Sequence, residues 1–299
     1  MNPHTFTAPP ARDNPAPAGD PGPTTLAERW HALGAAIDQA LNDLRAPGGW
    51  LARLLAARQQ AVDLAAQRPD AALYHLMGTV DRGHRRDDGP RALLRLLVCR
   101  QAAALWGWPA PLRCGLELAA LTLHRGTPTA QRQRDSGVAD ALWVQIVALN
   151  DTPGLDDQPL DRLPPAAQAS RLLRRVDGLV ELLGSGAVSL PVSPALAVRQ
   201  ACLGADGVPD EIGAALLGAL GVYPPGSFVR LASDETAVVV GRGVRANLPQ
   251  VVVLVDADGS PARALLRRDT GQAAYAVRGP VSGQAVRVVA PHDRVRAAG

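Results

Sequence analysis

The stretch Gly221-Val222-Tyr223-Pro224-Pro225-Gly226 divides the sequence into a helical part and a strand-forming part. Each proline lacks a backbone N–H and fixes φ near about −65°, so a helix that ends around Leu220 cannot continue through this stretch. Residues 211–220, just before it, are rich in Ala and Leu, which favour helix. After it, β-branched runs of strand length follow at 227–231, 236–240 and 251–255. The sequence therefore predicts a helical bundle followed by a small β domain.

The chain is long enough for one larger helical domain and one smaller domain. It has 299 residues, of which 47% are hydrophobic. Residues 1–23 are dominated by Pro, Ala, Asp and Gly and carry few large apolar groups, so we expect a disordered tail there. We therefore predict the tail at 1–23, a helical bundle at 24–220 and a small β domain at 221–299.

Apolar residues at intervals of three and four predict the helices of the bundle. In the first helix, Trp30, Leu33 and Ile37 form one apolar stripe. The predicted helices cover residues 26–41, 50–67, 70–77, 91–106, 111–124, 138–149, 166–183, 194–203 and 209–220. Three polar or proline-rich stretches are predicted to be loops, at 80–90, 127–136 and 152–165.

About five strands are expected after the Tyr-Pro-Pro stretch. The last two are predicted at 273–277 and 285–289, and Asp258-Gly259 supplies a turn. Antiparallel strands of this length suggest a small sheet or a partly closed barrel that packs on the bundle. The predicted fold class is therefore mainly α with a small β appendage (α+β).

The charge of the chain gives little support to nucleic-acid binding. The formal net charge is +3, and all 31 basic residues are arginines. An arginine excess together with abundant Ala, Gly and Pro is typical of a genome rich in G and C, so we interpret the arginines first as solvated side chains. Six of them could instead bind phosphate through paired hydrogen bonds, namely Arg125, Arg132, Arg134, Arg171, Arg174 and Arg175. We expect no nucleic-acid partner, because such a partner requires one contiguous basic face and a steep salt dependence of binding.

The cysteines and the apolar runs indicate a reducing compartment and no membrane partner. Cys99, Cys114 and Cys202 lie in apolar helical contexts and are predicted to be reduced core residues. No Cys-x-x-Cys pair is present, so the sequence does not indicate a cysteine zinc site. No apolar run approaches the roughly 20 residues that span a bilayer. The N-terminus has Pro, Asp and Gly where a signal peptide has an apolar core, so we expect a cytoplasmic protein of bacterial type.

Several segments together resemble one family of helical signalling proteins. They are residues 118–121 (Leu-Ala-Ala-Leu), 137–143 (Gly-Val-Ala-Asp-Ala-Leu-Trp), 171–177 (Arg-Leu-Leu-Arg-Arg-Val-Asp), 220–231 (Leu-Gly-Val-Tyr-Pro-Pro-Gly-Ser-Phe-Val-Arg-Leu) and 237–240 (Ala-Val-Val-Val). On these segments the chain resembles the HD-GYP branch of the HD-domain phosphohydrolases over roughly residues 91–255, with an HD-GYP-like core at about 91–220. The resemblance implies an HD-domain-like helical bundle and a role in signalling by cyclic di-GMP. It also implies hydrolysis of that dinucleotide by metal ions such as Mn²⁺ or Fe²⁺, which position and deprotonate a water.

The residues at the family's metal-ligand positions depart from the family pattern. By the resemblance, the upstream histidine falls on Leu94, the His-Asp pair on Leu123 and His124, and the His-His-Glu set on Asn150, Asp151 and Thr152. Only Asp177 matches a ligand position directly, and leucine cannot coordinate a metal. The remaining candidate metal ligands are Asp177, His124 and Asp151; we assign no catalytic residue and expect no cofactor.

Two of these candidates also have structural interpretations, which we favour. Asp177 lies between Arg174, Arg175 and Glu181 on its predicted helix, so it is expected to pair locally with an arginine or to be solvated. His124 lies at a helix end, where the helix dipole favours a protonated imidazole.

The sequence leads to one main hypothesis and one alternative. The main hypothesis is a degenerate HD-GYP-like signalling protein, catalytically inactive, that binds a signalling protein or a nucleotide such as cyclic di-GMP. The alternative is a metal-dependent phosphohydrolase (cyclic di-GMP phosphodiesterase) with a rearranged active site. That site would use Asp177, Asp151, Asp140, His124 or the carboxylates of residues 156–161. No P-loop, Gly-x-Ser-x-Gly elbow or dinucleotide-binding glycine pattern indicates another chemistry.

Overall fold

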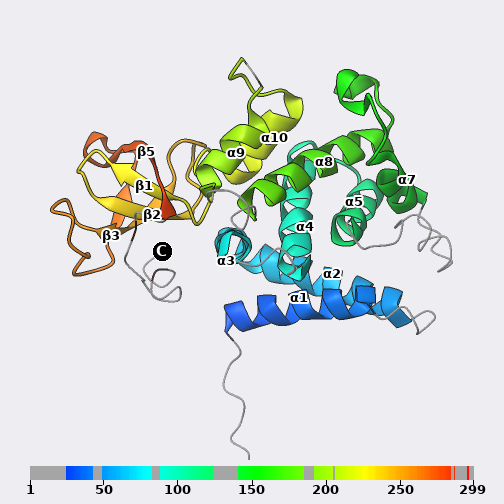
Figure 1. Cartoon of the computed structure of the whole chain (residues 1–299), viewed down its shortest axis with the longest axis horizontal. Coiled ribbons are helices and arrows are strands. Elements are labelled where there is room, and N and C mark those ends of the chain that lie inside the picture. The colour runs from blue at the N-terminus through cyan, green and yellow to red at the C-terminus, as the bar shows by residue number, and fades with distance from the viewer. Residues whose placement is uncertain are drawn as a thin grey trace, which may run out of the picture.

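The computed structural model describes residues 25–42, 49–82, 88–123, 141–184, 192–204 and 206–283, together with 286 and 295. The tail predicted at 1–23 and the loop predicted at 127–136 lie outside these residues. In the described part, helices come first and strands follow, so the prediction of a mainly helical chain with a small antiparallel sheet is confirmed (Figure 1).

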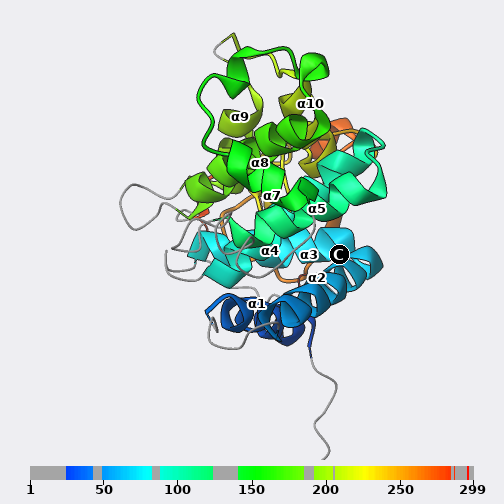
Figure 2. The same cartoon turned by 90° about the vertical axis from the view of Figure 1, so that its right-hand side faces the viewer.

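Helix α4 (Asp88–Leu105) runs through the middle of the bundle (Figure 1). Every residue from 91 to 99 is buried, which agrees with the strongly apolar sequence of this segment. Six helices pack against it, namely α1 (Leu26–Asn42), α2 (Gly49–Gln67), α3 (Pro69–Arg82), α5 (Ala110–Thr122), α8 (Pro165–Leu183) and α10 (Glu211–Leu220). The other two described helices, α7 (Ala141–Leu149) and α9 (Pro194–Cys202), pack against α8. Figure 2 shows the layers from the side, with α1 and α2 at one edge and α9 and α10 at the opposite edge.

The helix predictions are confirmed to within a few residues, except around the loop predicted at 80–90. There α3 continues to Arg82, and α4 already begins at Asp88. Pro90 lies in the first turn of α4, where a missing N–H costs no intrahelical hydrogen bond, and Asp88 favours the positive end of the helix dipole. Both described ends of the expected loop are therefore helical, while residues 83–87 lie outside the described part of the chain. Among the described residues, no helix combines the length and the apolar composition needed to cross a lipid bilayer.

The five strands of the described chain form one antiparallel sheet of order β4-β3-β2-β1-β5. They are β1 (Phe228–Leu231), β2 (Thr236–Gly241), β3 (Gln250–Val255), β4 (Arg267–Asp269) and β5 (Val277–Val281). Both faces of β2 and β3 are covered. Tyr74 of α3 packs on Val238, while Val239 packs in a second cluster with Tyr223 on the other face. This explains why β2 and β3 are nearly continuous valine runs and do not alternate.

The strand predictions fail at the C-terminal end. The strand predicted at 273–277 is wrong, because residues Ala273–Tyr275 form a 3-10 turn and β5 begins only at Val277. Alanines at 273 and 274 lack the branching that favours strands, and the ring of Tyr275 lies 4.7 Å below the guanidinium of Arg268. Strand β4 was missed because it is short and charged. The strand predicted at 285–289 lies outside the described residues apart from Val286, which is not in a strand.

The Tyr-Pro-Pro stretch turns the chain from α10 into the sheet, as predicted. Gly221 and Gly226 have φ of 78° and 93°, backbone angles that side chains strongly disfavour. The N–H of Val222 donates to the carbonyl of Ala246 (2.9 Å), and the N–H of Gly226 donates to that of Val239 (2.8 Å). The corner is therefore fixed to β2 and to the loop after it.

Arg242, directly after β2, connects the sheet to three helices of the bundle. Its Nε pairs with Asp70 Oδ1 of α3 at 2.5 Å, and its backbone N–H donates to Asp70 Oδ2 at 3.1 Å. Its Nη1 donates to Gln101 Oε1 of α4 and to the carbonyl oxygen of Ala219 in α10, both at 2.8 Å. One partly buried guanidinium thus holds the β domain against α3, α4 and α10.

We predict that Arg242→Ala lowers the free energy of unfolding by about 2 kcal/mol, because the oxygens of Asp70, Gln101 and Ala219 all lose the guanidinium that donates to them. Arg245→Ala is the matched control, since Arg245 is exposed on the same loop and makes no side-chain hydrogen bond with a described residue. Urea unfolding followed by tryptophan fluorescence measures both variants. Equal stability of the two variants would show that Arg242 does not hold the domains together.

Candidate functional site

Asp177, the strongest metal-ligand candidate, lies on α8 and forms an ion pair with Arg95 of α4. The distance from Asp177 Oδ1 to Arg95 Nη1 is 3.0 Å, and the two side chains are 15% and 5% exposed. Arg95 Nε also donates to the carbonyl oxygen of Ala120 in α5, at 3.1 Å. Burial lowers the pKa of the Arg95 guanidinium, while the charge and hydrogen bond of Asp177 act in the opposite direction. Asp177 does pair with an arginine, but the local pairing expected from the sequence is wrong, because the partner comes from another helix.

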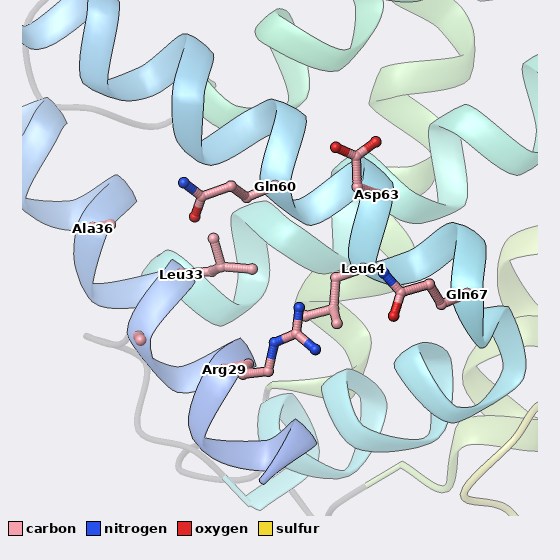
Figure 3. Close-up of a pocket in the computed structure, with 8 residues that line it drawn as sticks. Arg29, Leu33, Ala36, Gln60, Asp63, Leu64 and Gln67 are labelled. Carbon is pink, nitrogen blue, oxygen red and sulfur yellow. The ribbon is translucent and has the colours of Figure 1, made fainter. Parts of the chain in front are cut away.

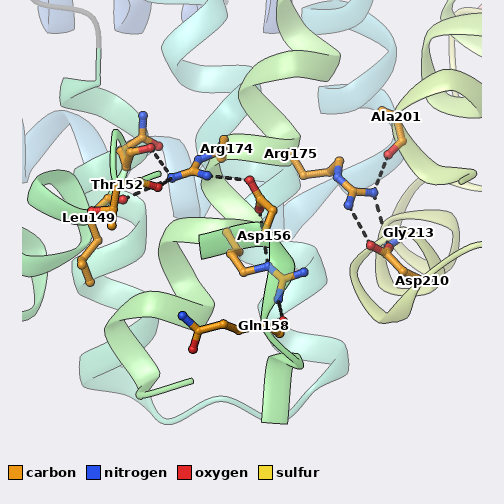
Figure 4. A network of polar contacts seen from close by, with 11 residues as sticks. Leu149, Thr152, Asp156, Gln158, Arg174, Arg175, Ala201, Asp210 and Gly213 are labelled. Carbon is orange, nitrogen blue, oxygen red and sulfur yellow. Dashed lines mark hydrogen bonds and ion pairs between the residues drawn. The ribbon is translucent and has the colours of Figure 1, made fainter. Parts of the chain in front are cut away.

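Asp151 lies in the turn that follows α7, and its side chain is exposed. Its carboxylate accepts a hydrogen bond from Asn150 Nδ2 at 3.4 Å. The turn itself is held to α8 by Arg174, whose Nη2 donates to the carbonyl oxygens of Leu149, Asn150 and Thr152 at 3.3, 2.5 and 3.1 Å (Figure 4). Arg174 therefore supplies donors to carbonyls that the end of α7 leaves without intrahelical partners. The turn is brought to α8 through its backbone, and Asp151 takes no part in that contact.

The remaining predicted ligand positions do not complete a metal site in the described residues. His124 and Asp140 lie outside the described residues. Leu94 and Leu123 are 0% and 6% exposed and belong to the apolar core of the bundle. Within the described ranges, no three His, Cys, Asp or Glu side chains gather as a metal ion requires. Since Asp177 already meets a guanidinium, the described donors do not fit the metal ions that the family resemblance implies.

Of the carboxylates of residues 156–161, only Asp156 contacts α8. Asp156, in the 3-10 turn Leu155–Asp157, pairs with Arg174 Nη1 at 2.5 Å and with Arg171 Nε at 3.5 Å. Arg171 Nη1 also donates to the carbonyl oxygen of Gln158. Asp157 and Asp161 are exposed. Arg171 and Arg174 thus hold the loop against α8, and Asp156, the one paired carboxylate of the loop, takes part in this contact.

Arg175 makes the corresponding connection on the other side of α8 (Figure 4). Its Nη2 lies 2.7 Å from Asp210 Oδ2, and its Nη1 donates to the carbonyl oxygen of Ala201 at 3.0 Å. Asp210 also caps α10 by accepting the N–H of Gly213 at 2.7 Å. Arg171, Arg174 and Arg175 were all candidates for binding phosphate. In the structure each is engaged with other parts of the same chain.

Two charged contacts of one buried residue were not predicted from the sequence. Glu117 of α5 is fully buried between Arg58 of α2 and Arg100 of α4, with 2.6 Å between Arg100 Nη1 and Glu117 Oε1. An isolated acidic residue in an apolar helix indicates that its side chain has a buried partner of opposite charge, and an arginine within an apolar run, such as Arg95, does the same. The sequence does not identify which residue that partner is.

The cysteine prediction is confirmed for Cys99 and Cys202, which are free and buried. Burial raises the pKa of the Cys99 thiol, and it raises that of Cys202 to about 12. Neither sulfur is therefore a thiolate near neutral pH. Cys114 is only partly buried.

Comparisons with protein-family models, with curated proteins and with solved structures find no match for this chain. The resemblance to the HD-GYP family therefore stays a prediction from the residues that carry it.

We predict that Asp177→Leu lowers the free energy of unfolding by about 3–5 kcal/mol, because it leaves the buried charge of Arg95 without its carboxylate. The double variant Arg95→Leu/Asp177→Leu should recover most of this loss, since it removes both charges. Asp161→Leu is the control, because the Asp161 side chain is exposed and forms no ion pair with a described residue. Urea unfolding followed by circular dichroism measures all three. If the double variant is as unstable as Asp177→Leu, the pairing argument is wrong.

We also predict that Asp210 stabilises the fold to an extent that depends on pH. Burial acts to raise the pKa of this carboxyl, but the hydrogen bonds from Arg175 and Gly213 and the charge of Arg175 outweigh it, so the pKa is lowered from 3.8. A carboxyl group whose pKa is lower in the folded chain than in the unfolded chain stabilises the fold at any pH above its unfolded-state pKa. This stabilisation is lost as the pH falls through its folded-state pKa.

The wild type should therefore exceed Asp210→Asn in free energy of unfolding by the largest amount at neutral pH. This difference should shrink as the pH falls below 3.8. Unfolding in urea, measured from neutral pH down to about pH 3, tests this. Asp206→Asn is the control, because Asp206 is exposed and has no arginine partner in the described chain. A difference that stays constant over this range would contradict the argument.

Proposed function

We propose that this chain is a degenerate HD-GYP-like signalling protein of the cytoplasm that acts by binding a partner and does not hydrolyse cyclic di-GMP. The observation that carries the proposal is the buried ion pair between Arg95 and Asp177. Asp177 is the residue that the resemblance aligns with a metal-binding aspartate, and Arg95 follows Leu94, which it aligns with a histidine.

The ion pair supports this proposal because it gives the carboxylate a cation from within the chain. A metal ion that used Asp177 would have to displace the guanidinium, and Arg95 would then keep a buried charge without its carboxylate. In active members of the family, the metal supplies the activation of the attacking water. Here the neighbouring residues Leu94 and Leu123 offer no donor atoms for such an ion.

Of the two partner classes, the described residues favour a signalling protein over a cyclic dinucleotide. A dinucleotide bound without hydrolysis needs donors for its phosphates, and arginine is the side chain best suited to that task. The described candidates Arg171, Arg174 and Arg175 already donate to carbonyl and carboxylate oxygens of this chain. A protein partner needs no such donors.

A combined metal and turnover assay tests the proposal. The purified full chain is incubated with Mn²⁺ or Fe²⁺ and desalted, its metal content is measured by mass spectrometry, and cyclic di-GMP hydrolysis is followed by chromatography. We expect less than one metal per chain and no hydrolysis, with an active HD-GYP enzyme as the positive control for the assay.

Stoichiometric metal together with turnover would overturn the proposal and favour the rearranged phosphohydrolase. Calorimetric titration with cyclic di-GMP in the absence of metal distinguishes the partner classes. If cyclic di-GMP binds without being hydrolysed, the proposed partner is the nucleotide and not a protein.

A further inference from the structure

The connection between α4 and α5, residues 104–111, is an exposed stretch without a charged side chain, which we call the tryptophan turn. Its sequence is Ala-Leu-Trp-Gly-Trp-Pro-Ala-Pro, and none of its residues is buried. Leu105 is 58% exposed, and a Cβ atom on Gly218 of α10 would lie 2.9 Å from Leu105 Cδ1, so the apolar surface continues onto that helix. Single exposed apolar residues are normal on a folded protein, but a contiguous run of this length indicates a docking surface.

Backbone hydrogen bonds hold the two tryptophans of this turn in place. The N–H of Trp108 donates to the carbonyl of Ala103, and the N–H of Gly107 donates to the carbonyl of Ala104, both at 3.1 Å. With the φ of 65° at Gly107, these bonds form a Schellman motif that closes the end of α4. The ring centroids of Trp106 and Trp108 lie 5.0 Å apart, and both residues are only partly buried. A Cβ atom on Gly107, between them, would meet no described atom within 4 Å. The two rings thus form an open, preorganised aromatic surface.

An aromatic surface of this kind suits a proline-rich segment. Proline rings pack on aromatic side chains, and a polyproline II segment is already extended before it binds, so little conformational entropy is lost. Residues 1–23 of this chain, which precede α1, contain seven prolines, and Pro9 and Pro10 are adjacent in the sequence Ala-Pro-Pro-Ala. These four residues carry no charge, which matches the uncharged tryptophan turn.

The chain between this proline pair and α1 is long enough to reach the tryptophan turn. A Cβ atom on Gly89 of α4 would lie 2.5 Å from the carbonyl oxygen of Gly34, so the two helices touch there. The path from Thr25 along α1 to this crossing, and then along α4 to Leu105, is about 43 Å long. The straight line is shorter, because α1 and α4 run in different directions (Figure 1). The residues between Pro10 and Thr25 extend over about 46 Å in the polyproline II conformation.

The groove between α1 and α2 is a second surface near the start of α1, and it suits this segment less well. It has a volume of about 550 Å³. Its lining includes charged and amide side chains (Figure 3), namely Arg29, Gln60, Asp63 and Gln67. An uncharged Ala-Pro-Pro-Ala segment in this groove would remove water from these groups and offer the charges no partner of opposite sign. The tryptophan turn imposes no such cost.

We propose that Pro9 and Pro10 of this chain dock on the tryptophan turn of the same molecule. The residues after the pair then lead from the turn back to the start of α1. Because the contact forms within one chain, it does not depend on the protein concentration. The N-terminal segment thereby covers an apolar surface that would otherwise be open to other proteins.

A photochemical cross-link in the full chain tests this contact independently of the proposed function. The residue at position 11 is replaced by p-benzoylphenylalanine, and the protein is irradiated at about 1 µM, where a tethered segment meets its own chain far more often than another one. Mass spectrometry then locates the cross-links. We expect them within residues 104–111.

A change in the proline pair tests the chemistry of the contact. Pro9→Gly/Pro10→Gly should lower the yield of these cross-links by about fivefold or more, because it removes both rings and the preference for an extended backbone. Pro21→Gly/Pro23→Gly is the matched control. It makes the same change outside the docked pair, so the yield should stay nearly the same.

A change in the tryptophan turn tests the surface itself. Leu105→Asp places a charge in the turn and should lower the yield to a similar extent, whereas Leu196→Asp, at a 41% exposed position of α9, should not. Circular dichroism checks that the variants fold, which we expect because both leucines are exposed. Cross-links to α1 or α2 in place of the turn would assign the segment to the groove and overturn the proposal. So would an absence of cross-links to residues 104–111, cross-links that join two chains, or a yield that the Pro9/Pro10 variant or Leu105→Asp leaves unchanged.

Discussion

A guanidinium group taken out of water has to be met by carboxylate or carbonyl oxygens, and the packing of this bundle depends on that constraint. Helix α4 carries two such groups. Arg91 meets Glu181 and the carbonyl of Val180 on α8, and Arg95 meets Asp177. In a third pair the buried member is the carboxylate, Glu117 of α5, which meets the 34% exposed side chain of Arg100. These contacts fix the positions of α5 and α8 on α4 more narrowly than apolar contacts do, because each charge is satisfied in only one arrangement.

The same constraint explains why a chain rich in arginine has little basic surface on α8. Arg174 donates to the last carbonyls of α7, and Arg175 donates to a carbonyl near the end of α9. These are places where helices leave backbone oxygens without partners. Arginine suits them because its planar fork presents several donors at once. The arginines of α8 thus connect the ends of neighbouring helices, and a count of basic residues overstates what is available to an external phosphate.

The sequence predicts those features that local chemistry determines. The helices follow from the spacing of residues such as Trp30, Leu33 and Ile37, and the change to strands follows from Pro224 and Pro225. It does not predict β4, whose residues Arg267–Asp269 become a strand only by pairing with β3. Nor does it predict the partner of Asp177, because its nearest arginines in sequence turn to other elements while Arg95, far away in the chain, reaches it. Contacts between distant segments decide both cases, and one sequence carries no record of them.

The α1–α2 layer and the sheet are both attached firmly to the bundle. The layer is tightly attached to the bundle: a Cβ atom on Gly89 of α4 would lie 2.5 Å from the carbonyl oxygen of Gly34 in α1, and Arg58 of α2 reaches Glu117. The sheet is attached just as directly, through Arg242. In Figure 1 the sheet and the α8–α10 helices lie away from the outward side of α1 and α2. The bundle therefore holds the sheet and the α1–α2 layer in a fixed relation, because the polar contacts of Arg58 and Arg242 each require one arrangement of the elements that they join.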